Sequence, residues 1–153
     1  MGSELIHYIL THENDDLSKL LLTKKNILGY PTTFVATQIN GRRRAKEKLP
    51  TWYANPNIVY PPQQNLEQCS SEITARLKCE FITKTPAIPT SPGGTTCLAD
   101  LTGGFGVDSF FLSHIFKRVI HVEPNPGLLK LARESHAILG ISAATPGVLR
   151  MDQ

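Results

Sequence analysis

Cysteine is scarce in this sequence, and long apolar runs are absent. The 153 residues include three cysteines, Cys69, Cys79 and Cys97, without a CxxC or Cys/His spacing. The odd number argues against a disulfide framework and the spacing against a zinc site, so we expect reduced thiols and no bound metal. No stretch approaches the roughly 18 consecutive apolar residues of a membrane span, and the N-terminus carries acids where a signal peptide carries Lys or Arg. We therefore expect a cytoplasmic protein without membrane contact.

The sequence also has little excess of charge of either sign. Charged residues make up 19% of the chain and the net charge is +3, so the overall composition does not indicate a nucleic-acid partner. The local exception is residues 40–48, NGRRRAKEK, with five cations: Arg42, Arg43, Arg44, Lys46 and Lys48. One interpretation is an RNA-binding surface on which Trp52 stacks against an unpaired base. The other is an ordinary solvated helix face.

The first half of the chain has the periodicity of short amphipathic helices. The positions expected in their shared core are Leu5, Ile9, Leu17, Leu20, Leu21 and Phe34. Residues 49–65, rich in proline and without a period, predict an ordered strap whose aromatic side chains cover apolar surface. A further helix is predicted over 66–82, with a core-facing stripe formed by Leu66, Cys69, Ile73, Leu77 and Phe81. The sequence thus predicts a helical N-terminal domain over residues 1–84.

The pattern changes after a turn-rich segment, residues 85–95, which we interpret as a linker. Short apolar runs at 96–101 and 118–123 predict two strands, and amphipathic segments at 106–116 and 125–140 predict two helices. This alternation predicts a parallel sheet with right-handed crossovers. In the second strand, His121 is expected to point outward. The predicted fold class is α/β: a helical N-terminal domain followed by the first part, β-α-β-α, of a Rossmann-like sheet over residues 96–153.

Three glycines follow the first predicted strand in the sequence ADLTGGFGVDSFF. Gly103, Gly104 and Gly106 allow the backbone to turn sharply and to approach a ligand where a Cβ would clash. Glu123 ends the second predicted strand, where its carboxylate can accept both hydroxyls of a ribose. A glycine loop and a strand-ending acid together indicate an adenosine-binding site. The alternative is a tight strand-to-helix connection beside a solvated glutamate.

The residues around the glycines narrow the choice of ligand. Val107 and Asp108 stand where a phosphate-binding Walker loop has Lys and Ser or Thr, and the spacing differs from the GxGxxG of dinucleotide folds. Asp100 precedes the loop, where its carboxylate would face a cationic amino group. S-adenosylmethionine carries such a group on its methionine part, and it is therefore the cofactor that we expect.

The segments DLTGGFGVDSFFLS and VIHVEPNPGLLKLARESHAILGI resemble class I S-adenosylmethionine-dependent methyltransferases. The likeness is to RNA methyltransferases of the cap guanine-N2 type and to bacterial relatives with a helical N-terminal domain. It implies that Asp100, Gly103, Gly104 and Gly106 surround the methionine part of the cofactor and that Glu123 binds its ribose. Asp108 matches a polar position of related enzymes, although an acid in the first turn of a helix is also favourable by itself.

The chain departs from this family after the second predicted strand. The family's catalytic loop follows a later strand, so no catalytic residue is assigned, and the segment ISAATPGVLRMDQ is expected to supply neither a further strand nor the acid that contacts adenine. An unpaired sheet edge would need self-association or a C-terminal half to complete it. Two functions stay open: the N-terminal portion of a methyltransferase acting on RNA, or a non-catalytic RNA- or protein-binding module derived from one.

Overall fold

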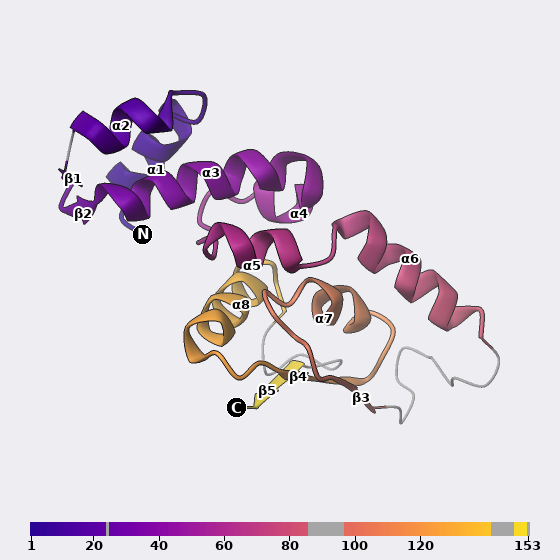
Figure 1. Ribbon diagram of the computed structural model, residues 1–153. Coiled ribbons are helices and arrows are strands. Elements are labelled where there is room, and N and C mark those ends of the chain that lie inside the picture. Colours follow the sequence, from indigo (N-terminus) through magenta and orange to yellow (C-terminus); the bar gives the residue numbers. More distant parts are fainter. Residues whose placement is uncertain (24, 86–96, 142–148, 153) are drawn as a thin grey trace. The chain divides into compact units, whose positions relative to one another are not determined.

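The computed structural model describes residues 1–23, 25–85, 97–141 and 149–152 (Figure 1). The chain divides into two compact units, Met1–Glu67 and Gln68–Gln153. The sequence places the boundary at 85–95 instead, most of which lies outside the described residues. The difference arises because the helix over Glu72–Thr83 packs against a helix of the second unit.

The N-terminal unit is helical apart from one short hairpin. Its elements are α1 (Ser3–Thr11), α2 (Leu17–Thr23), β1 (Asn26–Ile27), β2 (Tyr30–Pro31), α3 (Thr32–Lys48), α4 (Pro50–Tyr53) and α5 (Gln63–Gln68). The Asp16 carboxylate accepts the backbone N–H of Ser18 at 2.9 Å and so caps the start of α2. The hairpin was not predicted from the sequence. Its turn residues, Leu28 and Gly29, both have positive φ, and leucine is not a usual residue in such a turn.

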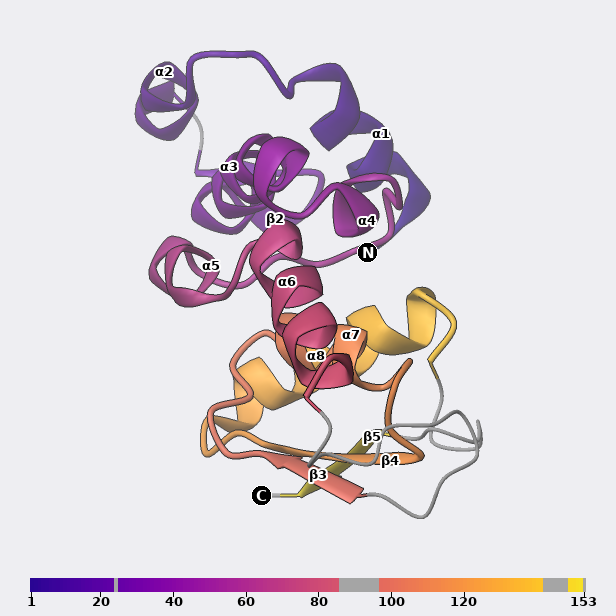
Figure 2. The ribbon, with the colours of Figure 1, turned by 90° about the vertical axis from the view of Figure 1, so that its right-hand side faces the viewer.

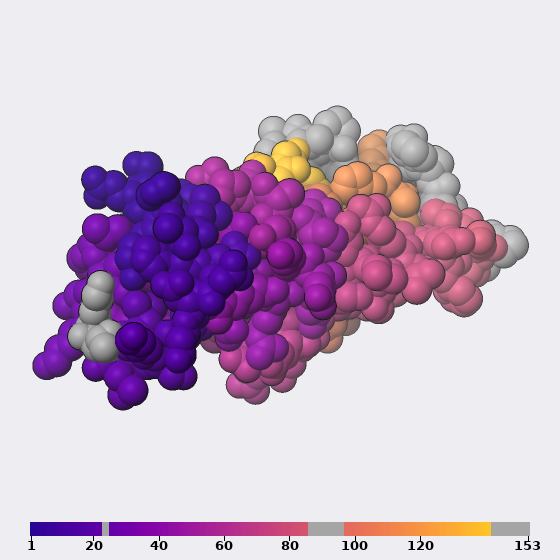
Figure 3. Space-filling model, turned by 90° about the horizontal axis from the view of Figure 1, so that it is seen from above, coloured from indigo at the N-terminus to yellow at the C-terminus, as the bar shows by residue number. Residues whose placement is uncertain are grey.

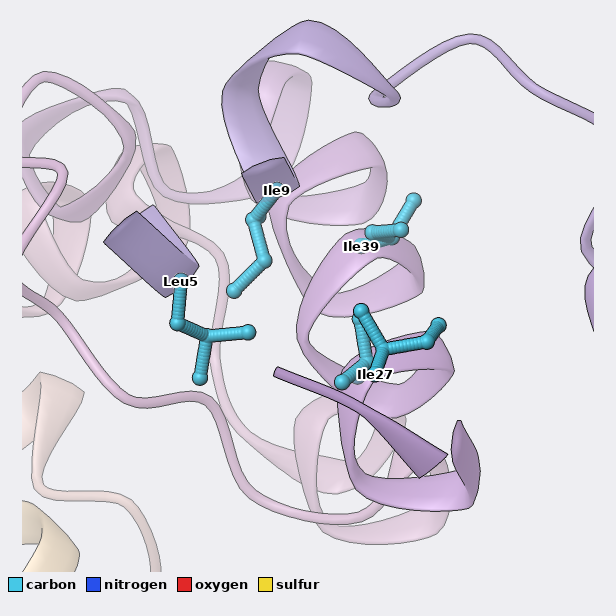
Figure 4. Packing of buried hydrophobic residues seen from close by; sticks show 5 residues of the cluster. Leu5, Ile9, Ile27 and Ile39 are labelled. Atoms are coloured by element: carbon cyan, nitrogen blue, oxygen red, sulfur yellow. The ribbon is translucent and has the colours of Figure 1, made fainter. Parts of the chain in front are cut away.

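The core of the N-terminal unit joins α1, the hairpin and α3 (Figure 4). Its buried members are Leu5, Ile9, Ile27, Val35 and Ile39. Of the six residues expected in this core, Leu5 and Ile9 are buried, while Leu17, Leu20 and Phe34 are partly buried and pack against the cluster. The sixth was predicted wrongly, because Leu21 is 46% exposed. Residues at 3.6-residue spacing form a stripe, but the edge of a stripe on a short helix stays in solvent.

The predicted strap over residues 49–65 does cover apolar surface, as expected. Trp52, Ile58 and Tyr60 are almost completely buried. The Gln38 side chain pairs with the backbone of Tyr60: its Nε2 donates to the carbonyl at 3.1 Å, and its Oε1 accepts the N–H at 2.8 Å. Gly41 gives the Tyr60 ring access to α3, since a Cβ at position 41 would lie 2.7 Å from Tyr60 Cγ. A buried amide pair and a close approach thus hold the strap on the helix.

The second unit carries a three-stranded parallel sheet in the order β3-β4-β5. Its elements are α6 (Glu72–Thr83), β3 (Cys97–Asp100), α7 (Val107–Leu112), β4 (Arg118–Val122), α8 (Pro126–Ile138) and β5 (Leu149–Asp152). Figures 1 and 2 show α7 and α8 on the same face of the sheet. The expectation that the chain ends after two strands was wrong. The strand over Leu149–Asp152 has two charged residues among its four, so it lacks the apolar run that identifies a buried strand.

The single helix predicted over 66–82 is interrupted. It breaks between α5 and α6, where Ser71 caps α6 by accepting the N–H of Thr74 at 3.1 Å. The break changes which face of α6 is buried, and the predicted stripe is wrong at Ile73, Leu77 and Phe81, which are 69%, 58% and 75% exposed. Space-filling Figure 3 shows much of α6 at the surface. The inward face carries Cys79 and Ile82, which pack against a cluster of Leu112, Phe116 and Val119.

Candidate functional site

The glycine loop joins β3 to α7 at the carboxyl end of the strands. Its backbone is tied to the neighbouring strand, because the N–H of Gly103 donates to the carbonyl of Val122 at 3.0 Å. The N–H of Gly106 then closes a turn onto the carbonyl of Gly103 at 2.8 Å. Gly104 and Gly106 have φ values of +56° and +84°, which glycine adopts without strain. The predicted position of the loop, between strand and helix, is confirmed.

The three glycines serve different purposes. A Cβ at Gly103 would lie 2.5 Å from Nδ1 of His121, and a Cβ at Gly106 would lie 2.6 Å from Cε1 of His136. Two of the glycines are therefore required by imidazole rings packed against the loop. At Gly104 the nearest atom to a built Cβ is the Thr102 carbonyl oxygen, 3.8 Å away, so the space there is open. Of the three, Gly104 is the position where a ligand can approach the backbone.

Glu123 connects the glycine loop to the start of the next helix. Its Oε2 accepts the N–H of Gly104 at 2.9 Å, and its Oε1 accepts the N–H of Asn125 at 2.8 Å. Asn125 caps α8 by accepting the N–H groups of Gly127 and Leu128. Glu123 is only 9% exposed, so both bonds are held in a mostly buried setting. Each carboxylate oxygen retains a second lone pair and can accept a further hydrogen bond from a ligand.

Asp100 ends β3 and has a protein partner on each oxygen. Its Oδ1 accepts the N–H of Thr102 at 3.2 Å, and its Oδ2 accepts the hydroxyl of Ser109 at 2.6 Å. The same hydroxyl lies 2.9 Å from Nδ1 of His121. The expectation that His121 points outward was wrong, because the residue is completely buried. The strand reads Val-Ile-His-Val, apolar on both faces, so its sequence does not indicate which alternate set points inward.

Asp108 stands in the first turn of α7 and connects it to α6. Its Oδ2 accepts the Ser70 hydroxyl at 2.8 Å and forms an ion pair with the Lys78 ammonium at 2.7 Å. Beside it, the Arg76 guanidinium covers the ring of Phe111, 4.5 Å from the centroid. These contacts explain why α6 packs on α7. They give Asp108 a role within the unit alongside its expected place near the cofactor.

His136 supports the loop from α8. It is 2% exposed, and its Nε2 lies 2.9 Å from the carbonyl of Gly106, to which it donates a hydrogen bond. Burial lowers the pKa of His136 from 6.5 to about 4, although the bond to Gly106 opposes this shift. Burial also lowers the pKa of His121. Sequence reasoning expected His121 to point outward and gave His136 no role, although both lie in the segment VIHVEPNPGLLKLARESHAILGI.

The depressed pKa of His136 predicts that the second unit loses stability in mild acid. The unfolded ring takes a proton below pH 6.5, whereas the folded ring resists protonation down to about pH 4. Stability is therefore complete above pH 6.5 and declines as the pH falls toward 4. We expect the free energy of unfolding to be about 2 kcal/mol lower at pH 5 than at pH 7. Urea unfolding followed by NMR signals of α8 at both pH values measures this difference.

The control for this pH effect is His136→Gln, because the glutamine amide can still donate to the Gly106 carbonyl but does not titrate. The difference between pH 5 and pH 7 should shrink in this variant, leaving a smaller part from His121, whose pKa is shifted in the same direction. An unchanged difference would show that His136 is not the titrating group.

The glycine N–H groups of the loop are not available to a phosphate group. The N–H groups of Gly103, Gly104 and Gly106 all donate to acceptors within the protein. The acceptor of the Gly104 N–H is the Glu123 carboxylate, and the Asp100 carboxylate stands at the start of the loop. A phosphate needs free N–H groups and positive charge. The geometry therefore favours a ligand that is free of phosphate and carries hydroxyl groups or positive charge.

The basic run lies on α3, and its first two arginines are engaged within the N-terminal unit. Arg42 is 7% exposed, forms an ion pair with the Glu13 carboxylate at 3.1 Å and lies over the ring of Tyr53. Arg43 donates to the backbone carbonyls of Glu13 and Asp15. These two guanidinium groups stabilise the connection between α1 and α2 on the surface of α3.

The remaining cations of the run are more exposed. Arg44 forms an ion pair with Glu67 at 2.8 Å, and Lys48 donates to the carbonyl of Glu67 at 2.7 Å. Lys46 is exposed. Trp52 is completely buried, so its ring has no free face for a base. The part of the predicted RNA surface that faces solvent is therefore Arg44 and Lys46.

Three further findings concern the described part of the chain. None of its helices is long and apolar enough to cross a membrane. It contains no group of three His, Cys, Asp or Glu side chains arranged to hold a metal ion. The three cysteines are free thiols.

The second unit defines a class of protein: an α/β fold whose parallel sheet opens with a glycine loop and whose second strand ends in an acid. Over 97% of its length the chain is similar to a crystal structure described as a "putative methyltransferase from Porphyromonas gingivalis W83", with 26% identity and a TM-score of 0.69. The chain spans about a third, 33%, of the length of that protein. No family model matches the chain, and no curated protein matches it either.

This likeness supports a methyltransferase fold. It gives no support to the narrower cap guanine-N2 subtype. The Rossmann-like sheet is present in part, as three strands rather than the two expected.

Proposed function

We propose that this chain is the S-adenosylmethionine-binding portion of a methyltransferase. The observation that carries the proposal is the position of Glu123, whose carboxylate is bonded to the N–H of Gly104 at the one loop glycine that faces open space. A hydroxyl-bearing ribose placed there would find free lone pairs on the carboxylate and unobstructed backbone beside it. The methyltransferase neighbour supports the same choice of cofactor.

The carboxylates around the loop favour this cofactor over nucleotides. When bound, S-adenosylmethionine supplies an electrophilic methyl group on a positively charged sulfur, and it contains no phosphate. Asp100 is half-buried at the end of β3 and would attract the ammonium group of the methionine part. The residues of this chain would hold and orient the cofactor, and the catalytic loop is expected elsewhere in the protein.

The third strand extends the proposed site. In the register of β4 and β5, Val122 is aligned with Asp152, so β5 ends at the same edge of the sheet as the glycine loop. Residues 149–152, which were expected to supply no further strand, therefore form one beside the proposed site.

Binding of S-adenosylhomocysteine tests the proposed cofactor site. In the full-length protein, Glu123→Ala removes two acceptors for ribose hydroxyls and should weaken binding by about 2 to 3 kcal/mol, since charge-assisted hydrogen bonds contribute about 1.5 kcal/mol or more each. Isothermal titration calorimetry measures the affinity. Glu134→Ala is the matched control, because Glu134 lies on α8 and pairs only loosely with Lys130 at 3.8 Å.

The result that would contradict the proposal is binding of a nicotinamide dinucleotide without binding of S-adenosylhomocysteine. Equal affinity in Glu123→Ala and wild type would also contradict it. Failure of the full-length protein to bind S-adenosylhomocysteine would favour the alternative, a non-catalytic module derived from a methyltransferase.

RNA is the substrate class that we propose for the transfer. Support comes from the resemblance of the motifs to RNA methyltransferases and from the solvent-facing cations Arg44 and Lys46 on α3. If these two contact phosphates, the double variant Arg44→Ala/Lys46→Ala should weaken RNA binding and reduce the slope of log affinity against log salt by about two. Fluorescence anisotropy at several salt concentrations measures the slope. An unchanged slope would leave α3 as a solvated face.

A further inference from the structure

Three buried or half-buried polar side chains form a chain of hydrogen bonds beneath the glycine loop. They come from three different elements: Asp100 from β3, Ser109 from α7 and His121 from β4. Ser109 and His121 have no exposed surface. The distances are 2.6 Å from Ser109 Oγ to Asp100 Oδ2 and 2.9 Å from Ser109 Oγ to His121 Nδ1. Asp100 belongs to the predicted cofactor site, but Ser109 and His121 were given no function there, so their hydrogen bonds require a separate explanation.

The direction of both hydrogen bonds follows from the number of protons. An ionised carboxylate only accepts, so the single hydroxyl proton of Ser109 must point to Asp100. The serine oxygen is then the acceptor toward the imidazole, and Nδ1 of His121 must carry a proton. Burial lowers the pKa of His121, which keeps the ring neutral near pH 7, although Asp100 and Glu123 oppose the shift. A neutral ring with a proton on Nδ1 leaves Nε2 bare.

The surroundings of His121 Nε2 agree with a nitrogen that carries no proton. Among the residues that the structure describes, Nε2 of His121 has no hydrogen-bond partner. The ring lies against Gly103, where a built Cβ would be 2.5 Å from Nε2. His136, on α8, presents its ring to His121 edge-on with the centroids 6.3 Å apart. The imidazole therefore packs against the first glycine of the loop, and its Nδ1 also contacts the Ser109 hydroxyl.

We propose that Ser109 and His121 are positioning residues of the cofactor site, which hold the Asp100 carboxylate and Gly103 in the geometry that the ligand requires. This inference rests on the proposed function. The hydroxyl fixes Oδ2 of Asp100 while the N–H of Thr102 fixes Oδ1, so the carboxylate has one orientation. Without Ser109 the carboxylate would lose one of these two bonds and rotate more freely, and an ammonium group would meet a less ordered partner.

The experiment separates hydrogen bonding from packing by comparing variants of the full-length protein. Ser109→Ala removes the hydroxyl, and His121→Phe keeps most of the ring volume but removes the Nδ1 donor. His121→Asn places an amide N–H near the position of Nδ1 and keeps the donor without the ring. We expect S-adenosylhomocysteine to bind about tenfold more weakly to Ser109→Ala and His121→Phe. His121→Asn should bind within about threefold of wild type, provided that circular dichroism shows each variant folded.

A second measurement reports on the network without the ligand. Nitrogen-15 NMR of the wild-type imidazole at pH 7 should show His121 with a proton on Nδ1 and a bare Nε2. In Ser109→Ala, the preference of His121 for the tautomer with a proton on Nδ1 should weaken, because the serine oxygen that accepts this proton is missing. A proton on Nε2 in the wild type would overturn the proposed direction of the bonds and with it the positioning role.

The binding measurements distinguish failure of this inference from failure of the proposed function. If the wild type binds S-adenosylhomocysteine and Ser109→Ala and His121→Phe bind equally well, the inference fails while the proposed function stands. If loss of the ring matters and loss of the donor does not, so that His121→Asn binds weakly and His121→Phe normally, the imidazole is only a packing element and the inference fails. If the wild type does not bind, the proposed function fails first.

Discussion

Gly106→Ala is expected to destabilise the second unit by about 2 to 5 kcal/mol. An added Cβ would lie 2.6 Å from Cε1 of His136 and 3.3 Å from Cβ of Ala132. Neither neighbour can retreat, since His136 is 2% exposed and Ala132 is completely buried. Overpacking of a buried site costs about 1 to 3 kcal/mol, and alanine at a φ of +84° adds about 1 to 2 kcal/mol. Urea unfolding followed by NMR signals of β4 and α8 measures the loss.

Two variants test the cause of this destabilisation. The double variant Gly106→Ala/His136→Ala removes the obstructing ring, so the two changes should couple by about 1 to 3 kcal/mol. Gly104→Asn adds a larger side chain to open space at a φ that asparagine tolerates, and should leave the unit folded. The same variant should nevertheless bind S-adenosylhomocysteine at least tenfold more weakly. Wild-type stability in Gly106→Ala would contradict the clash.

The sequence predicts the glycine loop because its signals are local. An apolar run, three glycines and a helical pattern follow one another between Ala99 and Phe111, and the loop lies where they predict. The reason for each glycine is not local. His121 and His136 meet the loop only after β4 and α8 fold beside it, so sequence reasoning assigned all three glycines to a ligand. In the structure, Gly104 is the glycine of the three beside which there is open space.

The third strand and the phase of α6 were also beyond the sequence pattern. The segment Leu149–Asp152 is too short and too charged to be recognised as a strand, and pairing with β4 identifies it. In α6, a stripe drawn from Leu66 onward assumed one continuous helix. Ser71 begins a new helix there, so the face that includes Phe81 turns to solvent. The single cap residue Ser71 thus ended the continuous helix that the stripe of five apolar residues had predicted.

The basic run shows a similar limit. Successive residues of a helix point about 100° apart, so three adjacent arginines span about 200° of its circumference, and one of them can fall at the edge of the buried face. The sequence could not show that Arg42 is the buried one. Its partner, Glu13, lies 29 positions away in the segment between α1 and α2. Arg42 therefore contributes more to the stability of the folded unit than a surface charge would.

Arg42→Ala is expected to lower the stability of the N-terminal unit by about 3 kcal/mol. The substitution leaves the Glu13 carboxylate mostly buried without its cation, and breaking one side of a buried ion pair costs about 3 to 5 kcal/mol. The Tyr53 hydroxyl still donates to Glu13 at 3.0 Å, which reduces the loss. The chain contains one tryptophan, Trp52, and it is buried in this unit. Its fluorescence during urea unfolding reports the stability directly.

Two controls separate the ion pair from the loss of side-chain volume. Arg44→Ala removes an exposed ion pair with Glu67 and should change stability by less than about 1 kcal/mol. The double variant Glu13→Gln/Arg42→Met leaves no unpaired charge and keeps most of the volume, so it should recover a large part of the loss. If Arg42→Ala were as stable as wild type, the arginine would be free for a ligand, and the RNA surface on α3 would have to include it.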